Sequence, residues 1–206
     1  MAFNCTHKPV VELFGVPPAP RTGRTRLIYA AIELVYSYGF QAIGVDQIVA
    51  AAGVTKTTFY KHFDGKDDLL AAAIQQRDEW EMQAWTAAVE RIAADDPKAQ
   101  LLAMFDVLDV WFNAPEFRGC QFINAAAEFP DPRDPVHQIA ARHKRKTRDY
   151  FRDLAAKAGA AEPEAFADHY TALVEGTLVL RQVHGRDDAA QAIKPAIERL
   201  VAESLP

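Results

Sequence analysis

The sequence has few cysteines, no long apolar run and no overall excess of positive charge, and each absence excludes a class of protein. Cys5 and Cys120 are the only cysteines among 206 residues. Two are too few for a disulfide framework, and they lack the CxxC spacing of zinc and redox sites. No segment approaches the roughly 18 consecutive apolar residues of a membrane span. Lys8, Pro9 and Glu12 interrupt any signal-peptide core, so we expect a soluble, cytoplasmic protein.

Motifs for catalysis are also lacking. The sequence contains no glycine-rich phosphate loop, nucleophile elbow, HExxH motif or cluster of residues with metal-ligand spacing. His137, His143, His169 and His184 are scattered along the chain, so each is better explained as a surface or core histidine than as a catalyst. We therefore predict no enzymatic activity, no metal and no cofactor.

Most of the remaining sequence has apolar residues at helical spacing. Helices are predicted at about residues 24–38, 46–52, 56–63, 66–94, 97–112, 120–129, 136–158, 164–184 and 188–204. No strand-like alternation is present, so the predicted fold is all-α with about nine helices. Residues 1–22 lack periodicity, and the proline-rich run at 16–20 favours an extended backbone. We expect a mobile N-terminal arm there, with docking of residues 10–16 on the body as the alternative.

One stretch has the pattern of a DNA-reading motif. Two short helical segments meet at Gly53, a residue that can take the positive φ of a tight helix-turn-helix turn. Phe59 and Phe63 are four residues apart and share the inward face of the second segment, which places Thr57 and Lys61 on the opposite face. Such side chains reach base edges and phosphates without steric bulk. A helical hairpin with a solvated face is the alternative.

Charge is divided unevenly along the chain. The whole sequence carries 23 Lys and Arg against 28 Asp and Glu, a net charge of −5, which alone argues against a nucleic-acid partner. Residues 1–66 hold seven basic and four acidic side chains, a local +3, and the rest of the chain has a local −8. A basic head and an acidic body are expected of a two-part DNA regulator.

A longer set of spaced residues extends the motif on both sides. It comprises Ala30-Ala31, Leu34, Tyr38-Gly39-Phe40, Ile48, Ala52-Gly53-Val54-Thr55-Lys56-Thr57-Thr58-Phe59-Tyr60-Lys61-His62-Phe63, Lys66 and Leu69-Leu70. This set resembles the DNA-binding domain of TetR-family transcriptional regulators. The resemblance implies an N-terminal three-helix helix-turn-helix DNA-binding domain at residues 23–70, followed by a helical ligand-binding and dimerisation domain at 71–206.

The resemblance also implies which residues meet DNA. The predicted DNA-binding set is Arg24, Thr25, Arg26, Gln47, Thr55, Lys56, Thr57, Thr58, Tyr60, Lys61, His62 and Lys66. Lys56, Thr57, Thr58 and Lys61 would face the major groove, and most of the others would contact the backbone. Many family members have Thr or Ser at the position of Val45, where the hydroxyl caps the helix or touches a phosphate. Valine cannot do this, so we expect Asp46 to supply the cap.

Aromatic residues are dense after residue 70, and several polar residues interrupt apolar helices. A buried polar group is costly unless it has a partner, and a mixed aromatic and polar pocket is what an effector site requires. The predicted ligand-binding set is Trp85, Phe105, Asp109, Phe112, Phe122, Asn124, Glu128 and Tyr170. The alternatives are ordinary core packing for the aromatic residues, and mutual hydrogen bonds or solvent exposure for the polar ones.

Two further features have a functional and an ordinary interpretation. The stretch Arg142–Arg148 is basic enough for nucleic acid, but Asp149 and Asp153 follow at helical spacing, which favours a solvated, ion-paired face. Cys120 lies near Arg118 at a predicted helix start, where an activated thiol could sense oxidants. A buried structural cysteine is the favoured interpretation.

The last two predicted helices present apolar stripes. These contain Ala172, Leu173, Gly176, Leu178, Leu180, Ile193, Ile197, Leu200 and Val201. Packing within one chain is one interpretation, and the resemblance implies a homodimer with a four-helix interface. The predicted function is a ligand-responsive transcriptional regulator, a repressor that binds a palindromic double-stranded operator as a dimer and is released by an unknown small molecule. A helical small-molecule-binding protein or an enzyme without DNA binding is the alternative.

Overall fold

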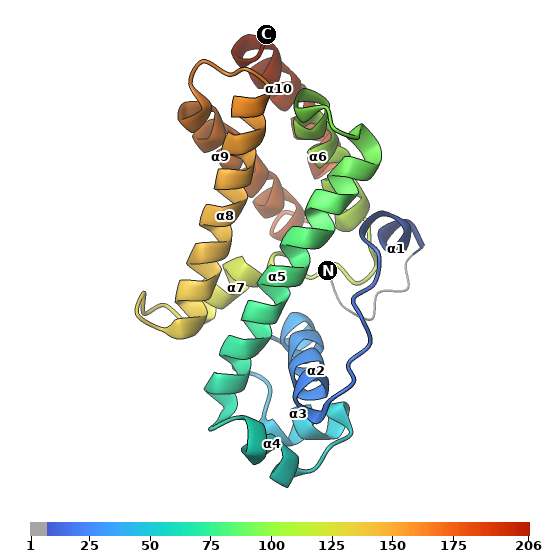
Figure 1. Cartoon of the computed structure of the whole chain (residues 1–206), viewed down its shortest axis with the longest axis vertical. Coiled ribbons are helices and arrows are strands. Elements are labelled where there is room, and N and C mark those ends of the chain that lie inside the picture. Colours follow the sequence, from blue (N-terminus) through green and yellow to red (C-terminus); the bar gives the residue numbers. More distant parts are fainter. Residues whose placement is uncertain (1–7) are drawn as a thin grey trace. The chain divides into compact units, whose positions relative to one another are not determined.

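The computed structural model describes residues 8–206, which are built from ten helices (Figure 1). These are α1 (Lys8–Phe14), α2 (Gly23–Tyr38), α3 (Val45–Ala52), α4 (Lys56–His62), α5 (Lys66–Ala93), α6 (Pro97–Phe112), α7 (Gln121–Glu128), α8 (Pro135–Lys157), α9 (Pro163–Gln182) and α10 (Ala189–Ser204). Residues 8–206 contain no strand, and none of their helices is long and apolar enough to cross a membrane. The all-α prediction is confirmed, with α1 as the additional helix. Cys5 and the start of the predicted arm lie outside the described residues.

Local chemistry explains where several helices begin and end. The hydroxyl of Thr55 accepts a backbone N–H from the first turn of α4, as the sequence predicts. Asp96 caps α6 in the same way, and Pro97 occupies its first position, where the missing N–H costs nothing. Gly53, with a φ of 59°, ends α3 in the left-handed conformation that makes the turn of the motif possible.

Helix α1 lies in the segment expected to be a mobile arm. Val10 and Phe14, four residues apart, share one face of α1, and both are buried. The guanidinium of Arg91 donates to the carbonyl of Leu13. At residues 8–14 the structure therefore departs from the predicted arm and matches the docking alternative. The proline-rich residues 16–20 are not helical, as predicted.

Contacts divide the described chain into two compact units. The first comprises residues 16–81 and 120–143, and the second comprises residues 8–15, 82–119 and 144–206. Helices α5 and α8 each begin in the first unit and end in the second. Helix α7 groups with the helix-turn-helix, although the predicted domain boundary at residue 70 assigns it to the effector domain. The first unit is therefore assembled from segments far apart in the sequence.

Each unit has its own apolar core. In the first unit α2 packs on α3 and α4, and the fully buried side chains include Leu27, Ile32, Ile48 and Phe59. In the second unit α10 packs along both α6 and α9 (Figure 1), and the buried side chains include Leu101, Phe105, Tyr170 and Ile197.

Candidate functional site

Helix α4 presents the polar face that its spacing predicts. Phe59 and Phe63 are buried on the inward side, and their ring centroids lie 6.0 Å apart. Thr57 and Lys61 are exposed, and Tyr60 is 64% exposed. The apolar side of α4 fixes its orientation, so its hydroxyls, phenol and lysine lie on the surface of the first unit.

Two residues of α4 face the start of α2 rather than open solvent. A Cβ atom on Gly23 would lie 2.8 Å from the methyl group of Thr58 and 3.8 Å from Nε2 of His62, so this close approach requires glycine. Thr22 and Thr25 cap α2 reciprocally, because each side chain accepts the backbone N–H of the other at 3.0–3.1 Å. The Thr25 hydroxyl, a predicted DNA contact, therefore already has a capping role.

The predicted arginines hold different positions in the first unit. Arg26 donates from Nη2 to the carbonyl of Gly53 at 2.7 Å, and a Cβ atom on Gly53 would lie 2.6 Å from that nitrogen. Arg26 thus braces the turn between α3 and α4. The guanidinium of Arg24 lies 5.3 Å from the ring centroid of Phe63 and remains exposed, which leaves its charge on the surface beside α4.

The start of α3 differs from the prediction. Its cap residue is Gly44, whose N–H donates to Oε1 of Gln47 at 2.7 Å. Asp46 instead pairs with Lys56 at 2.8 Å, and this hydrogen bond raises the pKa of Lys56. The prediction that Asp46 caps α3 is therefore wrong. The side chain of Gln47 accepts the hydrogen bond at the helix start instead, and the Asp46 carboxylate binds Lys56 of α4.

Several cations of the predicted DNA-binding set have no acidic partner. Arg24, Lys61 and Lys66 make no ion pair with any residue in 8–206. Thr57 and Lys61 make no side-chain hydrogen bond within that same part of the chain. Positive charge without an internal carboxylate is free to neutralise phosphates, so this surface is the candidate nucleic-acid interface among residues 8–206.

The eight predicted ligand-binding residues fall in both compact units. Phe122, Asn124 and Glu128 belong to the first unit, and Trp85, Phe105, Asp109, Phe112 and Tyr170 belong to the second. In the second unit, Phe105 and Tyr170 are fully buried with ring centroids 6.1 Å apart. The Tyr170 hydroxyl donates to the carbonyl of Leu101 at 2.6 Å, and burial raises its pKa. Ordinary core packing, the stated alternative, accounts for these two residues.

Glu128 has a structural partner that sequence reasoning missed. Its carboxylate accepts the backbone N–H groups of Phe40 at 3.0 Å and Gln41 at 2.9 Å. A Cβ atom on Gly39, whose φ is 89°, would lie 3.0 Å from Oε1 of Glu128. The carboxylate thus fastens α7 to the loop after α2. No local pattern marks this contact, because the acceptor and its donors are almost 90 residues apart.

A buried charged cluster joins α5, α7 and α8 within the first unit. Nε of Arg77 binds Glu81 at 2.7 Å, and Nδ1 of His143 lies 2.9 Å from Asp78. Nε2 of His143 lies 4.0 Å from Glu81, and Phe122 stacks on the imidazole with centroids 3.5 Å apart. Both ring nitrogens therefore lie near carboxylates of α5.

Burial raises the pKa of Glu81, but the positive charges of Arg77 and His143 and the Arg77 hydrogen bond outweigh it and lower the pKa to about 2. The only sequence signal for the cluster is the i,i+4 spacing of Arg77 and Glu81.

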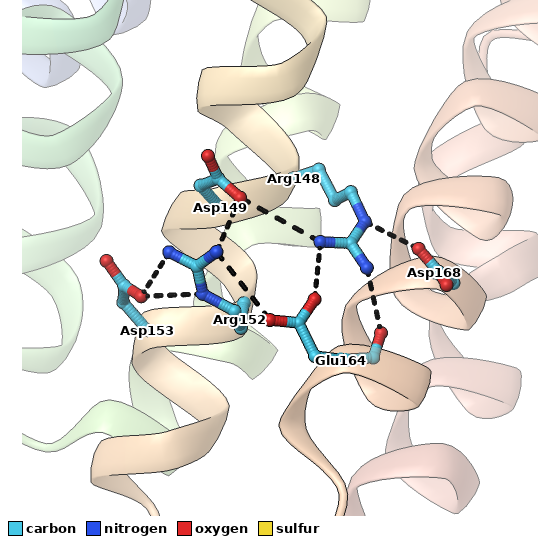
Figure 2. Close-up of polar contacts among 6 residues, drawn as sticks. All are labelled: Arg148, Asp149, Arg152, Asp153, Glu164 and Asp168. Carbon is cyan, nitrogen blue, oxygen red and sulfur yellow. Dashed lines mark hydrogen bonds and ion pairs between the residues drawn. The ribbon is translucent and has the colours of Figure 1, made fainter.

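The end of the basic stretch of α8 is ion-paired, as predicted for this helix face (Figure 2). Arg148 binds Asp168 at 2.5 Å and Glu164 at 2.8 Å, both on α9, and these hydrogen bonds raise its pKa. Arg152 binds Asp149 at 2.8 Å and Asp153 at 2.9 Å. The predicted acids take part, and the α9 carboxylates come in addition. This helix face is therefore an ion-paired network.

The stripes on α9 and α10 separate into inward and outward sides. Leu178, Ile197 and Val201 are buried within the chain. An exposed row on α9 contains Ala172, Gly176 and Val179 and continues into Val183, the residue after the helix; Val179 is 47% and Val183 71% exposed. A Cβ atom on Gly176 would have no atom within 4 Å. The inward residues follow the single-chain alternative, and the outward row is an apolar surface on the second unit.

Cys120 lies at the start of α7 and is 3% exposed. An oxidant in solution has little access to a thiol at this depth, which supports the structural interpretation over the sensing one.

Comparisons with known proteins agree with this geometry. The sequence profile described as "Bacterial regulatory proteins, tetR family" matches residues 27–73, and that of the "Tetracyclin repressor-like, C-terminal domain" matches residues 97–197. The chain is 30% identical to a TetR-family transcriptional regulator from Streptomyces coelicolor of known crystal structure, with a TM-score of 0.80, 88% of this chain covered and 95% of that one.

Two curated relatives extend the comparison. The chain is 27% identical to the transcriptional regulator AcuR of Cereibacter sphaeroides, over 84% of this chain and 87% of that protein. It is also 40% identical to the transcriptional activator FasR of Mycolicibacterium smegmatis, over 26% of this chain and 24% of that protein.

Proposed function

Because the chain belongs to the TetR family of transcriptional regulators, we propose that it is a repressor that binds a palindromic operator as a homodimer and releases the DNA when a small molecule binds. The observation that carries the proposal is the exposed polar face of α4. Thr57 and Lys61 occupy this face without internal partners, above the buried Phe59 and Phe63. We propose that the protein acts where its DNA lies, in the cytoplasm.

The proposed DNA contacts follow the surroundings of each residue. Thr57 and Lys61 have the exposure needed for base edges, and Tyr60 and Lys66 suit backbone phosphates. Lys56 would have to exchange Asp46 for DNA, and Arg26 and Thr25 would act mainly by holding the turn and the start of α2. Residues 23–70 would form the DNA-binding domain, and residues 71–206 would bind the effector and the second subunit.

The outward row of α9 supports the proposed dimer. An exposed row of apolar side chains on one helix is typical of a protein interface, and a glycine in its middle allows two helices to approach closely. Two subunits would place two α4 helices in successive major grooves, which gives a palindrome the specificity that one short helix lacks.

The rival function, a helical small-molecule-binding protein or enzyme without DNA binding, differs in one measurable outcome. Fragments of the source genome would be incubated with the purified protein, and the retained fragments would be identified and tested by gel shift at several salt concentrations. We expect one or a few palindromic sites, with affinity falling steeply as salt increases. Retention of no particular fragment at moderate salt would favour the rival.

The dimer proposal is tested separately by sedimentation. Replacing Val179 and Val183 together with lysine places charge in the outward row, so we expect the double variant to sediment as a monomer and to lose operator binding. Val16, 64% exposed and outside the row, provides the matched control as Val16→Lys. An unchanged mass for the double variant would remove α9 from the interface.

A further inference from the structure

Helix α1 covers a group of aromatic side chains in the second unit. The Phe14 ring meets Trp85 edge-to-face with centroids 5.2 Å apart, and Trp85 meets Trp111 in the same way at 5.5 Å. Phe112 and Phe117 complete the group around Trp111, at 5.7 Å and 5.0 Å. We name Trp85, Trp111, Phe112 and Phe117 the aromatic cluster. Phe14 of α1 is not part of this cluster but contacts it through Trp85.

The attachment of α1 is limited. A helix of seven residues is not stable in water by itself, so its order depends on what it touches. The contacts are the buried side chains of Val10 and Phe14, together with the hydrogen bond from Arg91 to the Leu13 carbonyl. Loss of these few interactions would release α1 while the core of the second unit, built from α6, α9 and α10, keeps its packing.

Within the aromatic cluster, the indole N–H of Trp111 has no hydrogen-bond acceptor among residues 8–206. The residue is 3% exposed. A buried donor without an acceptor costs about 1–3 kcal/mol, and most buried indole N–H groups have a partner. Trp111 packs against Trp85, the ring that Phe14 meets, so the cluster offers both aromatic surface and one unused polar group.

We propose that the aromatic cluster is the effector site and that α1 is its internal occupant. A planar aromatic molecule with an oxygen acceptor would displace Phe14, pack against Trp85 and accept the hydrogen bond of Trp111. Displacement of α1 also removes the Leu13 carbonyl from the Arg91 guanidinium. The proposal rests on the proposed function, because it names the chemical class of the effector.

The position of α1 in the chain connects the site with the DNA-binding helices. Only residues 15–22 separate α1 from α2, and the prolines among them favour an extended backbone. Eight residues span at most about 28 Å, so docked α1 restrains the N-terminus of α2. Displacement of α1 removes this restraint, and the effector thereby changes the freedom of the first helix of the DNA-binding domain.

The first experiment measures competition in the purified full-length protein, without DNA. The probe is 2-naphthoate, a planar aromatic carboxylate, and its binding is followed by quenching of tryptophan fluorescence. Because α1 and the probe compete, weakening α1 by Phe14→Ala should tighten probe binding at least tenfold. Val10→Ala, on the same buried face, should act in the same direction even if Phe14→Ala folds poorly. Val16→Ala, exposed and beyond the helix, is the matched control and should change nothing.

A second variant tests the polar group. Trp111→Phe keeps an aromatic ring but removes the indole N–H, so in the Phe14→Ala background it should weaken probe binding at least fivefold. Equal binding by the two proteins would exclude Trp111 as the donor. If neither Phe14→Ala nor Val10→Ala tightens probe binding, the internal-occupant proposal is overturned.

Hydrogen exchange provides the decisive readout. Ordinary ligands slow amide exchange near their site, but here the probe should accelerate exchange at residues 10–14, since it replaces α1. Unchanged or slower exchange there would overturn the proposal. Operator retention is measured on the same samples without probe. If the protein binds its operator but the Phe14 and Val10 variants do not tighten probe binding, only the proposed effector site is refuted. If those variants tighten probe binding but the protein retains no operator, only the proposed regulatory function is refuted.

Discussion

Helices α4 and α8 both carry clustered basic side chains, but their neighbours differ. Around α4, the inward face meets apolar side chains, and Lys61 has no ion-pair partner among residues 8–206. Around α8, carboxylates of α9 and of α8 itself surround Arg148 and Arg152 (Figure 2). Neighbouring helices also reach α4, where Asp46 of α3 pairs with Lys56, but within the described part of the chain they leave Lys61 without an acid. A basic side chain therefore indicates a nucleic-acid surface only where the residues packed around it bring no carboxylate to it.

The difference predicts that cations held by carboxylates, such as Arg77 of α5 and Arg148 of α8, act on stability, and that Lys61 of α4, unpaired among the described residues, acts on DNA. Arg77 is the extreme case, because it is 1% exposed and binds Glu81. Arg77→Leu leaves the buried Glu81 carboxylate without its hydrogen-bonded cation, so we expect the free energy of unfolding, measured by urea denaturation, to fall by about 3–5 kcal/mol. The matched control is Arg145→Leu, an exposed arginine of α8, which should change stability by less than about 0.5 kcal/mol. Similar losses in the two variants would contradict the comparison.

The same buried pair predicts a pH dependence. The pKa of Glu81 is lowered to about 2 from 4.5, so its stabilising effect is complete above pH 4.5 and is lost as the pH falls toward 2. The loss amounts to about 3 kcal/mol. In Glu81→Gln, the free energy of unfolding should therefore fall less between pH 5 and pH 2 than it does in the parent protein. A slope equal to that of the parent protein would show that other acids dominate.

On the α4 side, Lys61→Ala should weaken operator binding by about tenfold and reduce the salt dependence by about one counterion, because one phosphate or base contact is lost. Thermal stability should stay the same, since the side chain is exposed and unpaired. Arg145→Ala provides the control from the basic stretch of α8 and should leave affinity within about twofold. Equal losses in both variants would assign DNA contact to α8 as well.

The smallest effect on stability is expected for the ion pairs between Arg148 of α8 and the carboxylates of α9. Arg148→Ala removes the bonds to Glu164 and Asp168, but both acids are mostly exposed, and such ion pairs contribute little to stability. We expect a small decrease in melting temperature, visible by calorimetry at low salt and absent at high salt. A large decrease that persists at high salt would show that Arg148 has a packing role.

The parts of the fold that could be predicted are those that depend on local sequence. The cap by Thr55, the turn at Gly53 and the inward pair Phe59 and Phe63 all act within a few residues, and each prediction is confirmed. Helix α1 could not be predicted, because it is short, lacks a clear cap and gains its order from Trp85 and Arg91 elsewhere in the chain.

Long-range partners decide the roles of the remaining site residues. Glu128 and Phe122 carry a polar and an aromatic group in an apolar helix, which suggests a pocket. Their actual partners, the Phe40 and Gln41 amides and the His143 ring, lie on distant segments. Likewise, the pairing of Asp46 with Lys56 in place of capping depends on how α3 and α4 are packed together. Spacing alone carries no information about such contacts.

The bond between Glu128 and the loop after α2 has a consequence for protein engineering. Chimeric regulators are designed by cutting after the helix-turn-helix and attaching a new sensor. A cut near residue 70 would discard Glu128 and leave the amides of Phe40 and Gln41 without their acceptor. A transplantable head of this protein would have to include α7, so the unit of exchange is a discontinuous set of segments.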